Sequence, residues 1–170
     1  NNLAPTTSTT TQLVLGDALA VALLKMRGFS SNDFAKYHPG GALGKKLFLR
    51  VGDLVQTEKP QVKLSSSVQD VIIEISSKRL GATAVVDSNI ISGLITDGDL
   101  RRMLEKRSDI NNLIASDIMT ENPKCISKNA LAAEALGVME VNQISQLVVD
   151  DEGTYIGIIH LHDILKEGIL

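Results

Sequence analysis

Thr96 and Asp99 lie three positions apart, directly after an apolar run that begins at Gly93. A hydroxyl and a carboxylate with this spacing suit two roles. They can cap a helix, with Thr96 at the N-cap and Asp99 near the third helical position. They can also bind a ligand, because free amides at a helix start attract phosphate and a carboxylate accepts hydrogen bonds from ribose hydroxyls. The spacing alone leaves both roles open.

The same pattern returns further along the chain as Gly157, His160 and Asp163, and an upstream aspartate repeats with it as Asp53 and Asp117. The offset between the two copies is the same for every one of these pairs. A period of this length is too long for a solenoid unit and suits a small domain. Two such units in tandem bury their open faces against each other, and the cleft between them can hold a ligand. We therefore expect the two turns to face each other and to frame one cleft.

Each repeat predicts the order strand–helix–strand–strand–helix. In the first, apolar residues at helical spacing predict a helix over 67–78 with Ser67 as its cap. Two β-prone runs at 82–86 and 90–95 flank a turn at 87–89, and a helix follows over 96–106. In the second, we expect a helix over 130–140, strands over 146–149 and 155–159 around a turn, and a helix over 161–166. The fold class is α/β (α+β).

Positions 1–48 stand outside the repeat. Hydroxyl side chains at 6–11 suit a helix N-terminus, an apolar stretch follows over 12–26, and Gly28 suits the stop. A helix apolar nearly all round needs partners on most faces, which favours a partner domain and a longer parent protein. A second, short helix is expected after Ser30 or Ser31, ending at His38-Pro39-Gly40-Gly41. Gly44-Lys45-Lys46 then resembles a linker. The predicted segments are 1–48, 49–109 and 110–170.

Composition and charge argue against several classes of function. The chain has 170 residues, a formal net charge of −3 and a pI near 5.6, and it lacks a basic patch dense enough for nucleic acid. The longest strictly apolar run, 18–24, is short for a membrane span. Cys125 is the single cysteine, expected in an edge strand, and fits a reducing, cytoplasmic compartment. No metal-ligand spacing is present. Lys45, Lys46 and Arg50 are expected to be solvated.

The motif Gly-hydrophobic-hydrophobic-Thr-x-x-Asp, repeated after a helix, strand and hairpin, resembles the tandem cystathionine-β-synthase (CBS) domain pair over about 49–170. The resemblance implies a regulatory module that binds adenosine or other nucleotides. Thr96, Asp99, His160 and Asp163 are then the candidate ligand-binding residues. His160 departs from the motif by replacing the threonine. With His162, it could sense pH or contact phosphate, or lie exposed at a helix start.

Positions 1–48 carry a second resemblance, in Leu3 to Thr10, in Gly16 to Leu24 and above all in His38-Pro39-Gly40-Gly41-Ala42-Leu43-Gly44. These runs are similar to the end of the sugar isomerase (SIS) domain in D-arabinose-5-phosphate isomerases, where an SIS domain precedes a CBS pair. The family interconverts ribulose 5-phosphate and arabinose 5-phosphate toward Kdo of lipopolysaccharide. The resemblance implies that His38 lies in the active site, for ring opening or proton transfer.

Several expectations follow from this second resemblance. No serine-rich phosphate loop accompanies His38, so the 170 residues alone are expected to be inactive. No cofactor is required. The expected effector is a nucleotide or a cytidine-monophosphate sugar, and the expected assembly is a homo-oligomer, with a dimer of CBS pairs and a full-length tetramer. Two alternatives are a ligand-free structural or dimerisation module, and a nucleotide sensor of another enzyme or a transporter.

Overall fold

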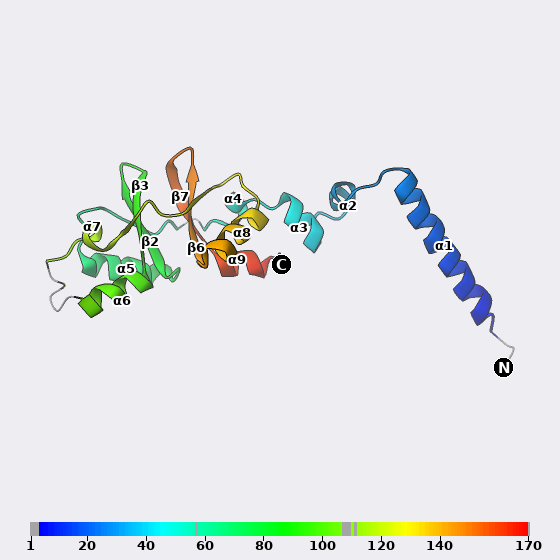
Figure 1. Ribbon diagram of the computed structural model, residues 1–170, viewed down its shortest axis with the longest axis horizontal. Coiled ribbons are helices and arrows are strands. Elements are labelled where there is room, and N and C mark those ends of the chain that lie inside the picture. The colour runs from blue at the N-terminus through cyan, green and yellow to red at the C-terminus, as the bar shows by residue number, and fades with distance from the viewer. Residues whose placement is uncertain (1–3, 57, 107–109, 111, 170) are drawn as a thin grey trace. The chain divides into compact units, whose positions relative to one another are not determined.

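The computed structural model describes residues 4–56, 58–106, 110 and 112–169 (Figure 1). The chain forms two compact units, Asn1–Gly44 and Lys45–Leu170, and each is described by itself. The predicted boundary between the two repeats, at residue 109, falls outside the described residues.

The first unit opens with α1 (Thr6–Met26), whose side chains are all exposed. The prediction that hydroxyls cap this helix is wrong. Pro5 is the N-cap, and the hydroxyls of Thr10 and Thr11 donate back to carbonyls one turn earlier, at 2.8 Å each. The predicted stop is confirmed: Gly28 has φ +63°, and the amide of Phe29 donates to the carbonyl of Leu24.

Among the described residues, α1 alone is long and apolar enough to cross a membrane, judged by length and composition only. The core helix of a soluble protein passes the same test. The strictly apolar run at 18–24 understated this length, because Gly16 and Asp17 interrupt the apolar sequence without breaking the helix.

The next helix, α2 (Ser31–Tyr37), ends at His38 as predicted and begins with a capping box between Ser30 and Asp33. The predicted linker at Gly44-Lys45-Lys46 is wrong, because α3 (Ala42–Phe48) contains it. A Cβ on Gly44 would lie 2.5 Å from the carbonyl oxygens of His38 and Pro39. Only glycine lets the helix approach the turn so closely.

The second unit holds the repeats. Its elements include the predicted order strand–helix–strand–strand–helix, but a short helix that was not predicted opens each repeat, and a further strand follows that helix in the second. The first repeat comprises α4 (Val51–Leu54), β1 (Gln61–Val62), α5 (Val68–Lys78), β2 (Ala82–Asp87), β3 (Ile90–Thr96) and α6 (Asp97–Lys106). The second comprises α7 (Ala115–Ile118), β4 (Thr120–Glu121), β5 (Cys125–Ser127), α8 (Ala132–Asn142), β6 (Gln146–Asp151), β7 (Thr154–His160) and α9 (Leu161–Lys166). Ser67 caps α5 as predicted.

The strands form one sheet in the order β1-β2-β3-β7-β6-β5, with β4 paired to β3. Each repeat contributes an antiparallel hairpin, β2–β3 or β6–β7, whose first strand also pairs in parallel with β1 or β5. The hairpins meet where Ile90 pairs antiparallel with Thr154. These two residues are equivalent in the repeat, so an approximate twofold axis passes between them.

The opening segment of each repeat packs on the other repeat. The amide of Val51 donates to the carbonyl of Ala130 at 2.9 Å, and its equivalent in the second repeat, the amide of Ala115, donates to the carbonyl of Ser66 at 2.8 Å. In agreement, α4 lies beside α8 in Figure 1, whereas α7 lies on the side of α5 and α6. Val51 belongs to the apolar core of the second repeat and Ala115 to that of the first. This exchange ties the two repeats into one compact unit.

Candidate functional site

The turn between β3 and α6 holds the first candidate pair. The backbone amide of Thr96 donates to Asp99 Oδ2 at 2.8 Å, its hydroxyl donates to the same oxygen at 2.6 Å, and the amide of Asp99 donates back to the Thr96 hydroxyl at 3.3 Å. This is a reciprocal capping arrangement. The capping role, left open by the sequence, is therefore present in the structure.

Capping does not distinguish Asp99 from other aspartates in the chain. Ser30 with Asp33, and Ser67 with Asp70, make the same three hydrogen bonds, with hydroxyl-to-Oδ2 distances of 2.6 and 2.7 Å. Two features set Asp99 apart. It is only 8% exposed, and its second oxygen, Oδ1, accepts from the hydroxyl of Thr120, in the opening segment of the other repeat, at 3.4 Å. The same oxygen accepts from the guanidinium of Arg102, much as Oδ1 of Asp33 accepts from Lys36.

The environment of Asp99 fixes its charge. Burial acts to raise the pKa of this carboxyl, but the hydrogen bonds from Thr96 and the guanidinium of Arg102 outweigh burial and hold the pKa below its usual value. Asp99 is therefore ionised at neutral pH. A buried, ionised carboxylate is a strong acceptor for ligand hydroxyls if one of its present donors moves away.

Asp99 lines a cleft of about 240 Å³ between α6 and α7. Arg102 and Lys106 line it from α6, and Asp117 and Ile118 line it from α7. Because α7 opens the second repeat, the cleft takes its walls from both repeats. The side chain of Arg102 is 60% exposed, so its guanidinium has room to turn toward an anion while it stays attached to α6.

The second candidate pair lies between β7 and α9. The amide of His160 donates to Asp163 Oδ2 at a long 3.4 Å, and the amide of His162 donates to Nδ1 of His160 at 3.0 Å. His160 thus replaces the threonine as a capping acceptor, which requires that its Nδ1 carries no proton. Burial, and then the neighbouring His162, lower the pKa of His160 and favour this neutral form.

The strand ends next to the two turns lie close together. Thr96 pairs with Ala82 in the first repeat, and His160 pairs with Gln146 in the second. The side-chain amide of Gln146 donates to the carbonyl of Leu80 at 3.2 Å, and a Cβ on Gly81 would lie 3.3 Å from both Gln146 Nε2 and Asp97 Oδ2. The residues that line the cleft at Asp99 come from α6 and α7 and do not include His160 or Asp163. One cleft framed by both turns therefore stays a prediction.

Sequence reasoning missed the residues that the exchanged segments bring to each site. Met119 lies over Gly93, where a Cβ would be 2.6 Å from its sulfur, and Val55 lies over Gly157, where a Cβ would be 2.5 Å from Cγ1. Thr120, next to Met119, reaches Asp99 for this reason. The signal was available in the sequence, because Val55 and Met119 occupy equivalent positions of the repeat.

His38 lies in the other unit. It ends α2, its ring lies 4.6 Å from that of Phe34, and its carbonyl accepts from the amide of Gly41 at 3.1 Å. The backbone of the His-Pro-Gly-Gly turn is thus held by hydrogen bonds and by the close packing of Gly44, while the His38 side chain is exposed.

Two other sequence expectations have clear outcomes. Cys125 lies in β5 at the edge of the sheet, as predicted. The expectation of solvated cations is wrong for Lys45, which is half-buried and pairs with Glu167 at 2.8 Å. Arg50 is exposed as expected, and its guanidinium also donates to the carbonyl of Asn129. Within the described part of the chain, no three His, Cys, Asp or Glu side chains are grouped as metal ligands.

Comparison with known proteins agrees with this architecture. The family model described as "CBS domain" matches residues 51–106 and 115–169, and the chain belongs to the CBS domain family as a tandem pair. Along 99% of its length the chain is 48% identical to the arabinose 5-phosphate isomerase KdsD of Yersinia pestis and 47% identical to that of Escherichia coli strain K12. It spans about half of these relatives, 52% of each. Both resemblances expected from the sequence are confirmed.

Solved structures show the same fold. A CBS domain protein from Pyrobaculum aerophilum complexed with AMP superposes with a TM-score of 0.63, covering 70% of this chain and 97% of its own, at 19% identity. The protein CBSX2 in complex with AMP gives a TM-score of 0.59, covering 70% and 95%, at 23% identity. At these identities the likeness establishes the fold alone.

Proposed function

We propose that residues 45–170 are the regulatory part of a cytoplasmic D-arabinose-5-phosphate isomerase of the Kdo pathway of lipopolysaccharide, and that they bind a nucleotide or a nucleotide-sugar. The similarity to isomerases over 99% of the chain supports the enzyme, and the AMP complexes of proteins with this fold support the class of ligand. The burial and charge of Asp99 carry the proposal for this chain.

The chemistry at Asp99 fits a nucleotide. The carboxylate is buried and its pKa is low, so it stays ionised, and Arg102 now neutralises it. A nucleotide supplies ribose hydroxyls for the carboxylate and a phosphate for the exposed guanidinium, so one charged pair gives way to two sets of charge-assisted hydrogen bonds. The cleft of about 240 Å³ is somewhat smaller than the roughly 300–1,000 Å³ of ligand sites. We therefore expect Arg102 to turn outward when the ligand enters.

Titration calorimetry with AMP, ATP, CMP and a cytidine-monophosphate sugar tests this proposal. Asp99→Ala should weaken binding about tenfold or more, the equivalent of one charged hydrogen bond. Asp33→Ala is the matched control, because Asp33 makes the same capping box in the other unit. It should leave binding unchanged. Asp163→Ala weakens binding only if the second repeat is also a working site.

A ligand-free assembly module is the second candidate function. It is favoured by the hydrogen bonds already made by both oxygens of Asp99 and by the histidine that replaces threonine in the second repeat. The absence of saturable binding by any of the four nucleotides would reject the sensor proposal and support this one. A sensor attached to a transporter or another enzyme is disfavoured, because positions 1–48 also match the isomerases.

For catalysis, we propose His38 as an active-site residue of the full-length protein, in ring opening or proton transfer. The 170 residues alone should show no isomerase activity, since the phosphate loop of an SIS domain is not among them. In a full-length protein, His38→Ala should remove most of the turnover in a coupled assay of ribulose 5-phosphate and arabinose 5-phosphate. Turnover equal to wild type would remove His38 from the mechanism.

A further inference from the structure

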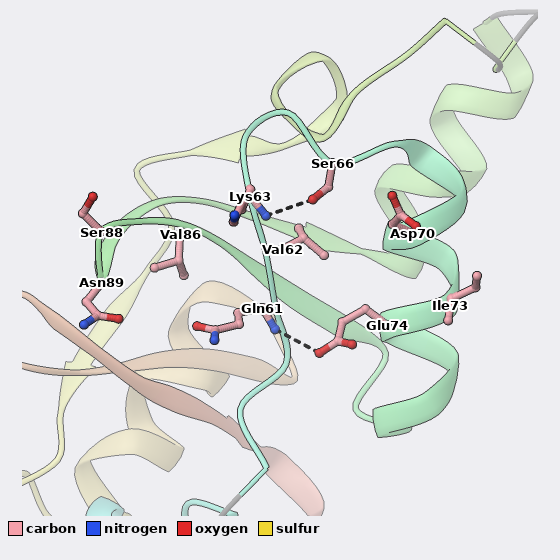
Figure 2. Close-up of a pocket in the computed structure, with 10 residues that line it drawn as sticks. All are labelled: Gln61, Val62, Lys63, Ser66, Asp70, Ile73, Glu74, Val86, Ser88 and Asn89. Carbon is pink, nitrogen blue, oxygen red and sulfur yellow. Dashed lines mark hydrogen bonds between the residues drawn. The ribbon is translucent and has the colours of Figure 1, made fainter.

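A second cavity lies at the other end of the first hairpin from Asp99. It encloses about 540 Å³ and takes its walls from β1, the loop after it, α5 and the turn between β2 and β3 (Figure 2). Thr96 pairs with Ala82 at one end of the hairpin, whereas Asn89 lies in the turn at the other end. This cavity shares no lining residue with the cleft at Asp99. Its volume is within the range of small-molecule sites.

The lining of this cavity belongs to the first repeat and does not follow from the fold. Most of its polar positions change chemistry at the equivalent positions of the second repeat: Gln61 becomes Cys125, Lys63 becomes Ser127, Ser66 becomes Ala130, Glu74 becomes Val138 and Asn89 becomes Gly153. The second repeat builds the same strands and helix without these groups. The polar lining is therefore a property of this site.

Two carboxylates on α5 form the negative wall. Asp70 and Glu74 are four residues apart and lie on one face of the helix. Each is held by one oxygen, since Asp70 Oδ2 accepts from Ser67 and Glu74 Oε1 accepts from the amide of Gln61 at 3.1 Å (Figure 2). Among the described residues, the other oxygen of each has no hydrogen-bond partner. The two carboxylates are thus oriented while half of their accepting capacity is available.

The polar lining residues outside α5 include no carboxylate and supply a cation and an amide instead. Asn89 lies in the hairpin turn, and Lys63 lies on the loop after β1, between that turn and α5 in Figure 2. Within the described residues, the ammonium of Lys63 makes no ion pair and the side-chain amide of Asn89 makes no hydrogen bond. Val62 from β1 and Ile73 from α5 add apolar surface to the lining. The cavity therefore presents separated charges of opposite sign, which suits a ligand with an ammonium at one end and an acid at the other.

We propose that this cavity is a second ligand site, which binds a small zwitterion with its ammonium on Asp70 and Glu74 and its phosphate or carboxylate on Lys63. Such a site is connected to the other repeat through one residue, Tyr155. The hydroxyl of Tyr155 donates to the carbonyl of Pro60, which precedes Gln61, at 2.7 Å, and its amide donates to the carbonyl of Asn89 at 3.0 Å. Two walls of the cavity are thus bonded to the same buried residue of the second repeat.

Amide chemical shifts of the 170-residue chain test the site, with three probes. Glucosamine 6-phosphate carries an ammonium and a phosphate, 4-aminobutyrate an ammonium and a carboxylate, and glucose 6-phosphate the phosphate alone. We expect saturable shifts at Gln61, Lys63, Asn89 and Tyr155 with at least one zwitterion. Glucose 6-phosphate should bind about tenfold or more weakly, because it lacks the charged donor. The zwitterion that binds shows whether Lys63 pairs with a phosphate or with a carboxylate.

Glu74→Gln removes the charge and keeps an acceptor for the amide of Gln61, and it should weaken zwitterion binding about tenfold. Lys63→Gln should do so to a similar degree and does not affect α5. The control Glu140→Gln removes an exposed carboxylate from α8 and should change nothing. Three results would overturn the proposal: no saturable shift with any probe at about ten millimolar, shifts centred on Asp99 instead, or equal binding by glucose 6-phosphate.

Discussion

The hydroxyl of Tyr155 donates a hydrogen bond of 2.7 Å to the carbonyl of Pro60, 95 residues earlier in the chain. Both residues are buried, and Tyr155 is only 3% exposed. Burial, with the nearby charge of Glu74, raises the pKa of the phenol and keeps it protonated as a donor. The counterpart of Tyr155 in the first repeat is Ile91, so this polar contact between the repeats is made in one direction only.

Tyr155→Phe should lower the free energy of unfolding by about 0.5–1.5 kcal/mol, because the buried carbonyl of Pro60 loses one of its two donors and keeps only the amide of Ala84, at 3.1 Å. Urea denaturation at pH 7 measures the change. Tyr37→Phe is the control, since Tyr37 is 76% exposed, and it should have no effect. An unchanged stability in Tyr155→Phe would mean that water replaces the phenol.

The second prediction concerns the close packing at the equivalent glycines Gly93 and Gly157. Gly157→Ala places a methyl group 2.5 Å from Cγ1 of Val55, and the overlap should cost about 1–3 kcal/mol. The double variant with Val55→Ala should recover part of that loss, which a double-mutant cycle measures. Gly137→Ala, in a helix with nothing within 4 Å of the new Cβ, should stabilise the protein by up to about 1 kcal/mol.

Local structure followed from the sequence wherever one side-chain pattern dominated. The apolar spacing of α5 and its Ser67 cap sufficed to place that helix, and the turn residues at 87–89 placed the β2–β3 hairpin. The linker expected at Gly44 was wrong, because glycine there serves a close contact with the His38 turn instead of breaking the helix. Composition cannot separate these two uses of glycine.

The candidate site was only half accessible to sequence reasoning. Thr96 and Asp99 were identified from their spacing, but Thr120 and Met119 reach them through a segment that packs on the opposite repeat. A repeat period shows which residues are equivalent. It does not show whether each opening segment packs on its own repeat or on the other. That choice depends on packing between residues distant in sequence, such as Val51 with the core around Met139.

Thr83 offers a third prediction. Its hydroxyl is buried in the first repeat and has no hydrogen-bond partner among the described residues, while the equivalent position in the second repeat is Leu147. Thr83→Val keeps the shape and removes the polar atom, so thermal unfolding should show a gain of about 1 kcal/mol. Thr83→Ser retains the hydroxyl and loses the methyl, and it should destabilise. A loss of stability in Thr83→Val would mean that the hydroxyl is bonded in solution.

Self-association is the fourth prediction. Ile73 on α5 and Leu104 on α6 are each 58% exposed, whereas their counterparts in the second repeat are glycines, Gly137 and Gly168. We expect these two exposed apolar side chains of the first repeat to be covered in a symmetric dimer. Light scattering at tens of micromolar, roughly where an interface of standard size saturates, should give a dimer or larger. Leu104→Glu should yield monomers, and Val141→Glu, at an exposed position of the second repeat, should not. A monomeric wild type would contradict the prediction.

The last prediction concerns pH and His160. Its Nδ1 accepts the amide of His162 at 3.0 Å, and this hydrogen bond requires the neutral ring. Burial, then the charge of His162, lower the pKa of His160 in the folded protein; Asp163 acts to raise it and Lys166 to lower it. The unfolded chain therefore takes up a proton first, near pH 6.5. The contribution of His160 to stability is fully present above that pH and is lost as pH falls through the lower, folded pKa. Urea denaturation between about pH 8 and pH 5 should show this decline in the wild type. His160→Thr restores the residue of the first repeat and a cap that does not titrate, so its stability should depend less on pH over this range. An identical pH dependence in the two proteins would show that His160 does not act as a titrating cap.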